Sequence, residues 1–518
     1  MSTYYKLGKR AGRIAMYNVI DYLESSAVRY SDKTAIIEED KSITYSDFLD
    51  KCKRVGSFLG ARLFFNEPII IFMDKGIDTL MAFFGAVYAG CFYCLVNPEL
   101  PKNRLLSIKE VLNSRLVITD DENLDAANEI FEGLDVYNIK ALKETEVNED
   151  ILATARERHI DTDPLYINFT SGSTGVPKGV TISHRSVIEF IDIFTEKFGF
   201  KNEDIIANQA PFDFDVSVKD IYSTIKMGAT LVIIPKKYFS SPAALLDYIC
   251  DNKVTTLTWA VSALCLVTTF HGLDYKCPDT VEKILFSGEV MPVKHLKQWM
   301  EHLPDTTFVN LYGPTEITCN CTYHIIDRNR DYDGKIPIGK AFPNERVYLM
   351  DEEGHIINEP DKAGEICIAG TSVGLGYYNN DEQTEKAFTF NPNVKGYGER
   401  IYKTGDLGYF NEAGEIIFNG RKDFQVKYQG HRIELEEVDK AIMEVPEVVR
   451  SCTIFDEEKS KLYGFYIGSI DKKELNARLR ETMPVYMMPT FLIQRKEFPM
   501  TKNGKIDRKK LMEERKKK

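Results

Sequence analysis

The chain of 518 residues lacks the features that mark secreted and membrane proteins. Residues 1–13 are polar and basic, and no apolar segment of the kind found in a secretory signal follows them. One stretch, residues 79–96, has nearly the length of a membrane span. It contains two glycines and ends at an Asn-Pro pair, so it predicts a buried helix running into a buried strand. We therefore expect no stable membrane insertion.

The ten cysteines show no disulfide framework and no metal-binding pattern. Cys91 and Cys94 form a lone CxxC pair, and Cys319 and Cys321 form a lone CxC pair. Neither has a second pair or a histidine at ligand spacing, so we expect buried free thiols. Such cysteine usage is typical of a reducing compartment and indicates a cytoplasmic location.

The chain also lacks an excess of positive charge. It has 66 basic and 78 acidic residues, for a net charge of −12. This balance argues against broad binding of nucleic acid or of anionic membranes. Apolar residues make up 43% and charged residues 28%, which is typical of globular domains. A chain of this length is too long for one compact core, so we expect at least two domains.

Short apolar runs alternate with amphipathic segments between about residues 45 and 420. One amphipathic segment begins after Ser183, which is suited to an N-cap, and keeps its apolar stripe through Phe198. The runs predict strands buried on both faces at residues 69–73, 116–119, 231–234, 284–286 and 308–311. Alternation of this kind predicts an α/β fold with helix-covered parallel sheets, which bind ligands at the carboxyl ends of their strands.

The pattern changes after Gly420. A charged segment, residues 420–423, follows a strand-like run at residues 416–418. Beyond it the sequence predicts strands near Thr453, Tyr463 and Phe491 and a helix near residues 472–481, in a β-α-β-β-α-β order. We therefore expect a large N-terminal core domain over residues 1–420 and a small α+β domain over residues 421–518.

Residues 170–179 (TSGSTGVPKG) are the strongest local signal for a phosphate-binding loop. Glycines let the backbone approach an anion, hydroxyls and amides donate hydrogen bonds to it, and Lys178 adds a positive charge. The segment is not a Walker loop, because Pro177 precedes the lysine and a β-branched run follows instead of a helix. Alone, it is also compatible with a plain Ser/Gly turn between strands.

Further motifs follow this loop in a fixed order. They are FDVS at residues 214–217, SGE at 287–289, NLYGPTE at 310–316, GEI at 364–366, GLGY at 374–377, YKTGDL at 402–407, GRKDFQVK at 420–427 and NGKIDR at 503–508. In order and spacing they resemble the adenylate-forming, or AMP-binding, superfamily of acyl-CoA synthetases, luciferases and peptide-synthetase adenylation domains. The resemblance covers nearly the whole chain. It implies a core domain of helix-covered mixed and parallel sheets with a small mobile C-terminal lid.

The resemblance implies that ATP and Mg²⁺ take part. Attack of a carboxylate on the α-phosphate brings two anions together, so the site must neutralise charge. In such proteins the loop and Lys178 bind the phosphates, and Glu316 holds Mg²⁺, which prefers oxygen ligands. Tyr312 stacks on adenine and Asp406 binds the ribose hydroxyls. The implied catalytic residues are Lys505, Lys178 and Glu316. The implied ATP-binding residues are Thr170, Ser171, Gly172, Ser173, Thr174, Lys178, Gly288, Asn310, Leu311, Tyr312, Gly313, Pro314, Thr315, Asp406, Phe418, Arg421 and Lys505.

Asp215 favours an amino acid as the acid that is activated. It stands where peptide-synthetase adenylation domains carry the aspartate that pairs with the substrate α-ammonium. A carboxylate would be a costly charge in a pocket for an acyl tail. An alternative is that Asp215 only caps a helix. The resemblance also places Val216, Lys219, Thr258, Leu285, Ser287, Leu311, Cys319, Asn320 and Lys505 around the substrate.

Lys219 leaves the identity of the amino acid open. Facing inward it would favour an acidic side chain, and facing outward it would be a surface lysine. The small polar residues nearby suit a small substrate. The sequence of residues 288–293 (GEVMPV) resembles the corresponding segment of D-alanine–D-alanyl carrier protein ligases. The sequence therefore predicts D-alanine or another small polar or acidic amino acid.

The acceptor of the activated amino acid is expected to be a separate molecule. Only thirteen residues follow Lys505, which leaves no room for a carrier domain, so we expect a separate carrier protein bearing phosphopantetheine. Two half-reactions at one site also predict that the small domain rotates about a hinge at Asp423. In the second state residues 427–430 would approach the thiol.

Three other functions remain alternatives. They are an acyl- or aryl-CoA synthetase, against which Asp215 argues, a luciferase-type oxidoreductase, and a non-catalytic binding protein, which the presence of Lys178, Glu316, Asp406 and Lys505 disfavours.

Overall fold

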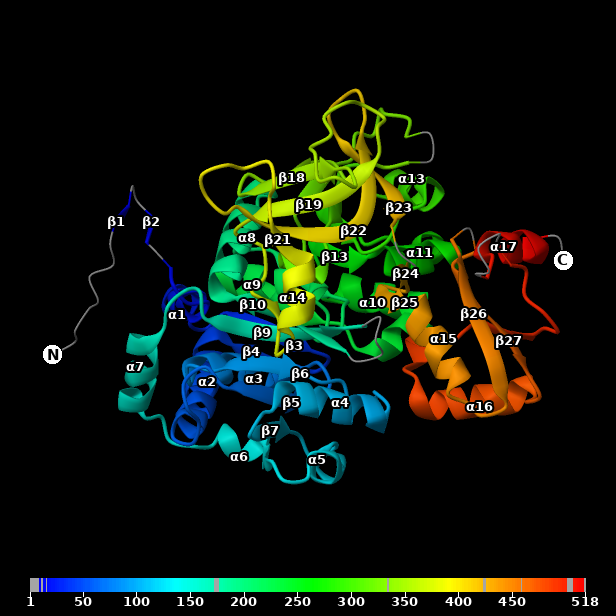
Figure 1. Ribbon diagram of the computed structural model, residues 1–518. Coiled ribbons are helices and arrows are strands. Elements are labelled where there is room, and N and C mark those ends of the chain that lie inside the picture. Colours follow the sequence, from blue (N-terminus) through cyan, green and yellow to red (C-terminus); the bar gives the residue numbers. More distant parts are fainter. Residues whose placement is uncertain are drawn as a thin grey trace.

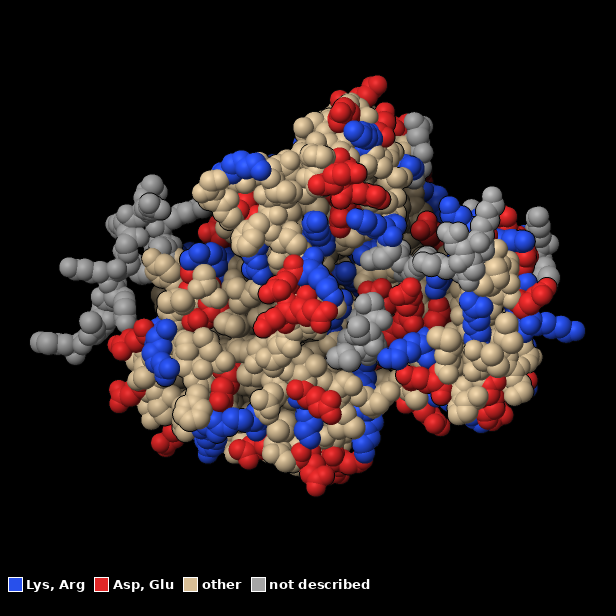
Figure 2. All heavy atoms as spheres, viewed as in Figure 1, with Lys and Arg blue, Asp and Glu red and all other residues tan. Residues whose placement is uncertain are grey.

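The computed structural model describes residues 9–10, 13–14, 16–171, 177–332, 335–422, 425–457, 459–500 and 506–516. The chain forms a large α/β body, and a smaller C-terminal unit packs beside it (Figure 1). Positive and negative side chains are interspersed over the face shown in Figure 2. No helix in the described part of the chain is both long and apolar enough to cross a bilayer.

The first main sheet has seven strands in the order β20-β10-β9-β6-β5-β7-β8. Its central strands are parallel, whereas β10 is antiparallel to both of its neighbours. The strands are β5 (Pro68–Phe72), β6 (Phe92–Leu95), β7 (Leu116–Thr119), β8 (Asp135–Asn138), β9 (Pro164–Thr170), β10 (Lys178–Ser183) and β20 (Gly376–Tyr377). The predicted strands at residues 69–73 and 116–119 are confirmed as β5 and β7.

The second main sheet has nine strands in the order β17-β16-β15-β14-β13-β11-β12-β3-β4. The strands from β15 to β3 are parallel. The three other predicted strands, at residues 231–234, 284–286 and 308–311, lie in this part of the sheet as β12, β14 and β15. The strands are β3 (Thr34–Glu38), β4 (Lys41–Thr44), β11 (Ile205–Asn208), β12 (Thr230–Ile233), β13 (Thr256–Ala260), β14 (Lys283–Ser287), β15 (Thr307–Tyr312), β16 (Thr322–Ile325) and β17 (Lys340–Ala341).

Helices separate and cover these two sheets, giving five layers. The largest core lies between the sheets and includes α1 (Ile20–Arg29), α2 (Tyr45–Gly60), α3 (Ile77–Tyr88), α8 (His184–Lys197) and α9 (Val216–Met227). A second core joins the nine-stranded sheet to α10 (Pro242–Asp251), α11 (Val261–Thr269) and α13 (Val293–His302). A third joins the seven-stranded sheet to α4 (Lys102–Leu112) and α5 (Leu124–Ile130). The prediction of helix-covered parallel sheets is confirmed.

Two local predictions for the body are also confirmed. Ser183 caps α8, because its side chain accepts a hydrogen bond from the backbone N–H of Ser186. The apolar stretch at residues 79–96 forms most of α3 and then β6, both buried. Its apolar character follows from the burial of α3 between the two sheets and of β6 on both faces of the seven-stranded sheet.

A third sheet and short elements complete the body. The third sheet runs β18-β19-β22-β21, and β23 pairs with β22. Its strands are β18 (Glu345–Met350), β19 (Gly364–Gly370), β21 (Phe388–Phe390), β22 (Arg400–Phe410) and β23 (Ile416–Arg421). The remaining elements are β1 (Lys9–Arg10), β2 (Arg13–Ile14), α6 (Ile139–Leu142), α7 (Glu149–Arg158), η1 (Lys236–Ser240), α12 (Gly272–Tyr275), η2 (Thr315–Ile317) and α14 (Asp381–Ala387).

The C-terminal unit has its own core and sheet. A hairpin of β24 (Gln425–Tyr428) and β25 (His431–Glu434) precedes α15 (Leu435–Met443). A three-stranded sheet of β26 (Val448–Asp456), β27 (Lys461–Gly468) and β28 (Phe491–Gln494) follows, with α16 (Lys472–Thr482), η3 (Val485–Met487) and α17 (Arg508–Lys516). The strands expected near Thr453, Tyr463 and Phe491 and the helix expected at residues 472–481 are present.

The domain boundary after residue 420 stays a prediction. Strand β23 continues through Arg421, which is paired in register with Asp406 of β22. Arg421 therefore belongs to the third sheet of the body. The predicted hinge residue, Asp423, lies outside the described residues.

Candidate active site

The predicted site residues gather where β13, β14 and β15 end, beside the first turn of α9. In this sheet Thr258 lies next to Leu285, and Ala260 next to Ser287, because neighbouring strands are parallel and in register. The intervening side chains, such as Trp259 and Phe286, enter the core on the opposite face. Since side chains alternate along a strand, Thr258, Leu285 and Ser287 point toward α9. The sheet thus supplies one wall of a pocket.

Buried residues form this wall throughout. Leu285 and Thr258 are fully buried, and Ser287, Leu311, Cys319 and Asn320 are each 2% exposed. The turn carrying Cys319 and Asn320 packs directly on Gly313, where an added Cβ would lie 2.5 Å from the Cys319 carbonyl oxygen. Thr318 and Cys319 both have positive φ, at 43° and 79°. Such a backbone is unfavourable for residues with side chains and is held here by the surrounding contacts.

Asp215 lies beside this wall, immediately before α9. Its side chain makes no capping hydrogen bond, so the helix-cap alternative is wrong. Burial raises the pKa of Asp215, although the side chain of Thr315 and the charges of Lys219 and Lys427 oppose this rise. Thr315 belongs to the predicted nucleotide motif, so that motif lies near the carboxylate predicted to bind the ammonium.

Lys219 faces the pocket. Its side chain is fully buried, and its Nζ donates to Ser287 Oγ at 3.1 Å and to Asn320 Oδ1 at 3.2 Å. The surface alternative for Lys219 is therefore wrong. Val216 begins α9 beside Asp215 and is half-buried.

Predicted nucleotide residues surround the end of β15. Asn310 is fixed by a hydrogen bond from its Nδ2 to the Pro337 carbonyl, at 2.8 Å. Tyr312 donates through its hydroxyl to Asp406 Oδ2 at 2.5 Å, and Arg421 donates to the other oxygen of Asp406. The Phe418 ring lies 6.5 Å from the Tyr312 ring, centroid to centroid. Gly288 has a φ of 95° and open space where a Cβ would stand, as the approach of a ligand requires.

The predicted phosphate loop joins two antiparallel strands. Thr170 ends β9 and is paired with Lys178, the first residue of β10. Lys178 Nζ lies 5.4 Å from the centre of the Tyr377 ring. Ser171 donates through Oγ to the carbonyl of Arg432 at 2.7 Å. Gly172, Ser173 and Thr174 lie outside the described residues, as does Lys505.

Glu316 is buried and paired with the C-terminal unit. Arg432 Nη1 donates to its two carboxylate oxygens at 2.8 and 3.0 Å, and the Tyr377 hydroxyl donates at 2.8 Å. Burial alone would raise the pKa of Glu316, but Arg432 and Tyr377 outweigh it and lower the pKa. An ionised carboxylate is the kind of ligand that Mg²⁺ prefers, but in this arrangement Arg432 occupies both oxygens of Glu316.

Sequence reasoning gave no role to Arg432, Glu289 or Tyr377, although it placed residues 427–430 near the thiol in the second state. Arg432 binds Glu316, and the backbone N–H of Gly430 donates to Glu289 Oε1 at 2.7 Å. Lys427 Nζ lies 5.5 Å from the centre of the Tyr312 ring. The motif at residues 374–377 brings Tyr377 to Glu316. The charged residues of the β24–β25 hairpin, Lys427, Arg432 and Glu434, were the only feature of the sequence there that pointed to a functional role for Arg432.

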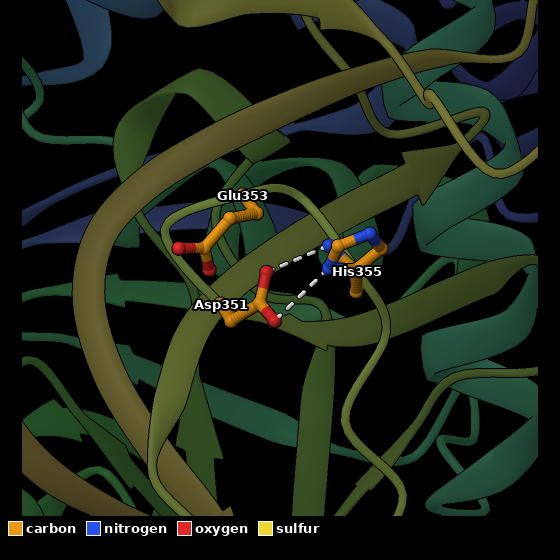
Figure 3. Close-up of side chains that lie close together, drawn as sticks. All are labelled: Asp351, Glu353 and His355. Atoms are coloured by element: carbon orange, nitrogen blue, oxygen red, sulfur yellow. Dashed lines mark hydrogen bonds and ion pairs between the residues drawn. The ribbon is translucent and has the colours of Figure 1, made fainter.

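A separate cluster on the surface carries no catalytic assignment. Asp351, Glu353 and His355 have potential metal-ligand atoms within 4.8 Å of one another. Figure 3 shows Asp351 turned toward His355, whose backbone N–H donates to it at 2.8 Å. Exposed turns often hold such acidic groups, and this one lies between β18 and β19.

Comparison with known proteins identifies the family. The model of the family described as AMP-binding enzyme matches residues 23–378. The chain belongs to the AMP-binding enzyme family. The resemblance found in the sequence is thereby confirmed.

The relatives extend over the whole chain. A D-alanine–D-alanyl carrier protein ligase of Bacillus cytotoxicus is 33% identical over 516 residues, covering 96% of this chain and 99% of its own. The ligase of the same name from Lacticaseibacillus casei is 32% identical with the same coverage. The adenylation domain AlmE of Vibrio cholerae, solved with glycyl-adenosine-5'-phosphate, has a TM-score of 0.85 at 20% identity, covering 99% of this chain and all of its own. The last comparison confirms the adenylate-forming fold.

Proposed function

We propose that this enzyme activates an amino acid with ATP and passes the aminoacyl group to the phosphopantetheine thiol of a separate carrier protein. The observation that carries the proposal is the position of Asp215, which directly precedes α9 beside the buried face of β13 and β14. This position suits a carboxylate that pairs with the α-ammonium of an amino acid, next to the motif expected to hold the nucleotide. A carboxylic acid lacking an amino group would leave Asp215 as an unpaired charge.

In the first half-reaction a carboxylate oxygen of the amino acid attacks the α-phosphorus of ATP. A new P–O bond forms and the bond to the β-phosphate oxygen breaks, so aminoacyl-AMP and pyrophosphate result. Asp215 orients the amino acid through its α-ammonium, while Lys178 offsets phosphate charge. Glu316 would hold Mg²⁺, which neutralises phosphate charge when bound. Asp406 and Tyr312 hold the nucleoside, and Lys505 bridges the two reacting anions.

In the second half-reaction the thiol sulfur attacks the carbonyl carbon of the aminoacyl-AMP. The C–S bond forms, AMP leaves, and the thiol proton is released. The β24–β25 hairpin already lies against the site through Arg432 and Gly430. Relatives at 32–33% identity are named for D-alanine and for a D-alanyl carrier protein, which supports a carrier protein as the acceptor.

Amino-acid-dependent exchange of labelled pyrophosphate into ATP tests the proposal. The panel holds both enantiomers of alanine, serine, aspartate and glutamate, together with glycine and cysteine. We expect exchange with at least one amino acid and none with its des-amino analogue. Equal exchange with the des-amino acid would refute the role of Asp215, and exchange with no amino acid would refute the proposed activity. A holo carrier protein then tests transfer, by thioester formation.

A further inference from the structure

Lys219 is a buried cation without an anionic partner in the part of the chain that the structure describes. Its Nζ bonds only to neutral oxygens, those of Ser287 and Asn320. Burying an unpaired ammonium destabilises the fold, so buried lysines usually have an anionic partner, either in the protein or in a ligand. Lys283, a buried lysine of β14, is paired in this way: its Nζ lies 3.1 Å from both carboxylate oxygens of Asp204.

The nearby acids do not supply the missing charge. Asp215 precedes Lys219 by one helical turn, but a bound amino acid would neutralise it with the α-ammonium. Asp220 is fully buried and accepts a hydrogen bond from Asn208. Burial raises its pKa to about 8, so Asp220 keeps its proton at neutral pH. With substrate bound, Lys219 is left as an uncompensated positive charge.

The pocket has further polar atoms without partners. Thr258 Oγ1 is buried and makes no hydrogen bond with the described residues. It shares the sheet face that carries Ser287, the residue bonded to Lys219. A hydroxyl without a hydrogen bond and an ammonium without an anionic partner point to a ligand with acceptor oxygens. A purely apolar side chain would leave the Thr258 hydroxyl unbonded and the charge of Lys219 uncompensated.

We infer that the amino acid accepted by this pocket carries an anionic side chain, and that Lys219 is its counterion. The inference rests on the proposed function. Positions one helical turn apart lie about 5–6 Å from each other, so Asp215 and Lys219 are spaced for the α-ammonium and the side-chain anion of a short dicarboxylic amino acid. Aspartate and glutamate, of either hand, are members of this class.

Isosteric pairs in the exchange assay test the inference on the unaltered enzyme. We expect kcat/KM for aspartate or glutamate to exceed that for asparagine or glutamine, and that for D-alanine, by at least about 30-fold. Preference for D-alanine, glycine or an amide would overturn it while leaving the proposed function intact. Failure of every amino acid would instead count against the proposed function itself.

Two variants separate a counterion from a structural lysine. Lys219→Met keeps the length of the side chain and removes its charge, so it should lower kcat/KM for the acidic substrate by about 30-fold or more and raise that for its amide. Lys219→Glu should move the preference toward a diamino acid such as 2,4-diaminobutyrate. Lys283→Met is the matched control, because it removes a buried lysine charge away from the pocket. It should lower Tm without changing the order of substrates. An unchanged order in both Lys219 variants would refute the inference.

Discussion

The contact between Arg432 and Glu316 offers the sharpest test of how the two parts of the chain cooperate. Arg432 belongs to the β24–β25 hairpin, and Glu316 follows β15 in the body. Their side chains are 17% and 1% exposed, so the pair is largely desolvated. We predict that Arg432→Ala impairs transfer to the carrier thiol far more than adenylation.

The magnitude follows from burial. Removing one member of a buried pair leaves an uncompensated charge and costs about 3–5 kcal/mol. Even the lower figure corresponds to a shift of about 100-fold in the equilibrium between docked and undocked hairpin, because each 1.4 kcal/mol is tenfold. Thioester formation that uses the docked hairpin should fall by that order. In the proposed mechanism Glu316 must be free to hold Mg²⁺ during adenylation, so pyrophosphate exchange should change by less than about threefold.

The assay compares pyrophosphate exchange with single-turnover thioester formation. Arg104→Ala is a second probe, since Arg104 of α4 pairs with Glu437 of α15 outside the site, and it should show the same pattern. Lys102→Ala is the control: Lys102 lies on the same helix but pairs with Glu129 of the body on the exposed surface, and both rates should stay near those of the unaltered enzyme. Equal losses in both half-reactions for Arg432→Ala would refute the reasoning.

Three other predictions concern single groups. Asp215→Asn should raise KM for the amino acid by about 30-fold or more and change KM for ATP little, as steady-state exchange kinetics would show; equal effects on both would contradict the ammonium contact. Lys505→Ala should lower exchange by about 10²-fold or more while ATP binding, measured by calorimetry, persists; exchange at the original rate would disprove its role. Asp220 is protonated when folded, with a pKa of about 8, but ionises near pH 4 when unfolded, so its contribution to stability falls as pH rises between these values. Asp220→Asn should therefore gain Tm relative to the parent from pH 5 to pH 8, and a constant difference would contradict the buried proton.

The predictable parts of this protein are those with a local cause. Periodicity alone located β7 at Leu116–Thr119, because a fully buried parallel strand must be apolar on both faces. The N-cap at Ser183 could be predicted because a serine directly precedes a segment with an apolar helical stripe. The orientation of Lys219 could not be read this way, since lysine suits the surface of α9 and only its packing against β14 and the 318–320 turn buries it. Arg432 was missed for the same reason: its partner stands 116 residues earlier in the chain.

If Glu316 holds Mg²⁺ as proposed, the charges at the site predict that the docked hairpin and the metal exclude each other. Glu316 is satisfied by Arg432, and Asp406 by Arg421 and Tyr312, so the acids implied to hold metal and ribose already have partners in this arrangement. A divalent ion at Glu316 would meet the guanidinium of Arg432 at close range, where like charges repel strongly in a desolvated site. Loss of the ion with pyrophosphate would leave Glu316 buried and unpaired, a state that Arg432 relieves. The departure of one cation thus favours the arrival of the other, which would order transfer after adenylation.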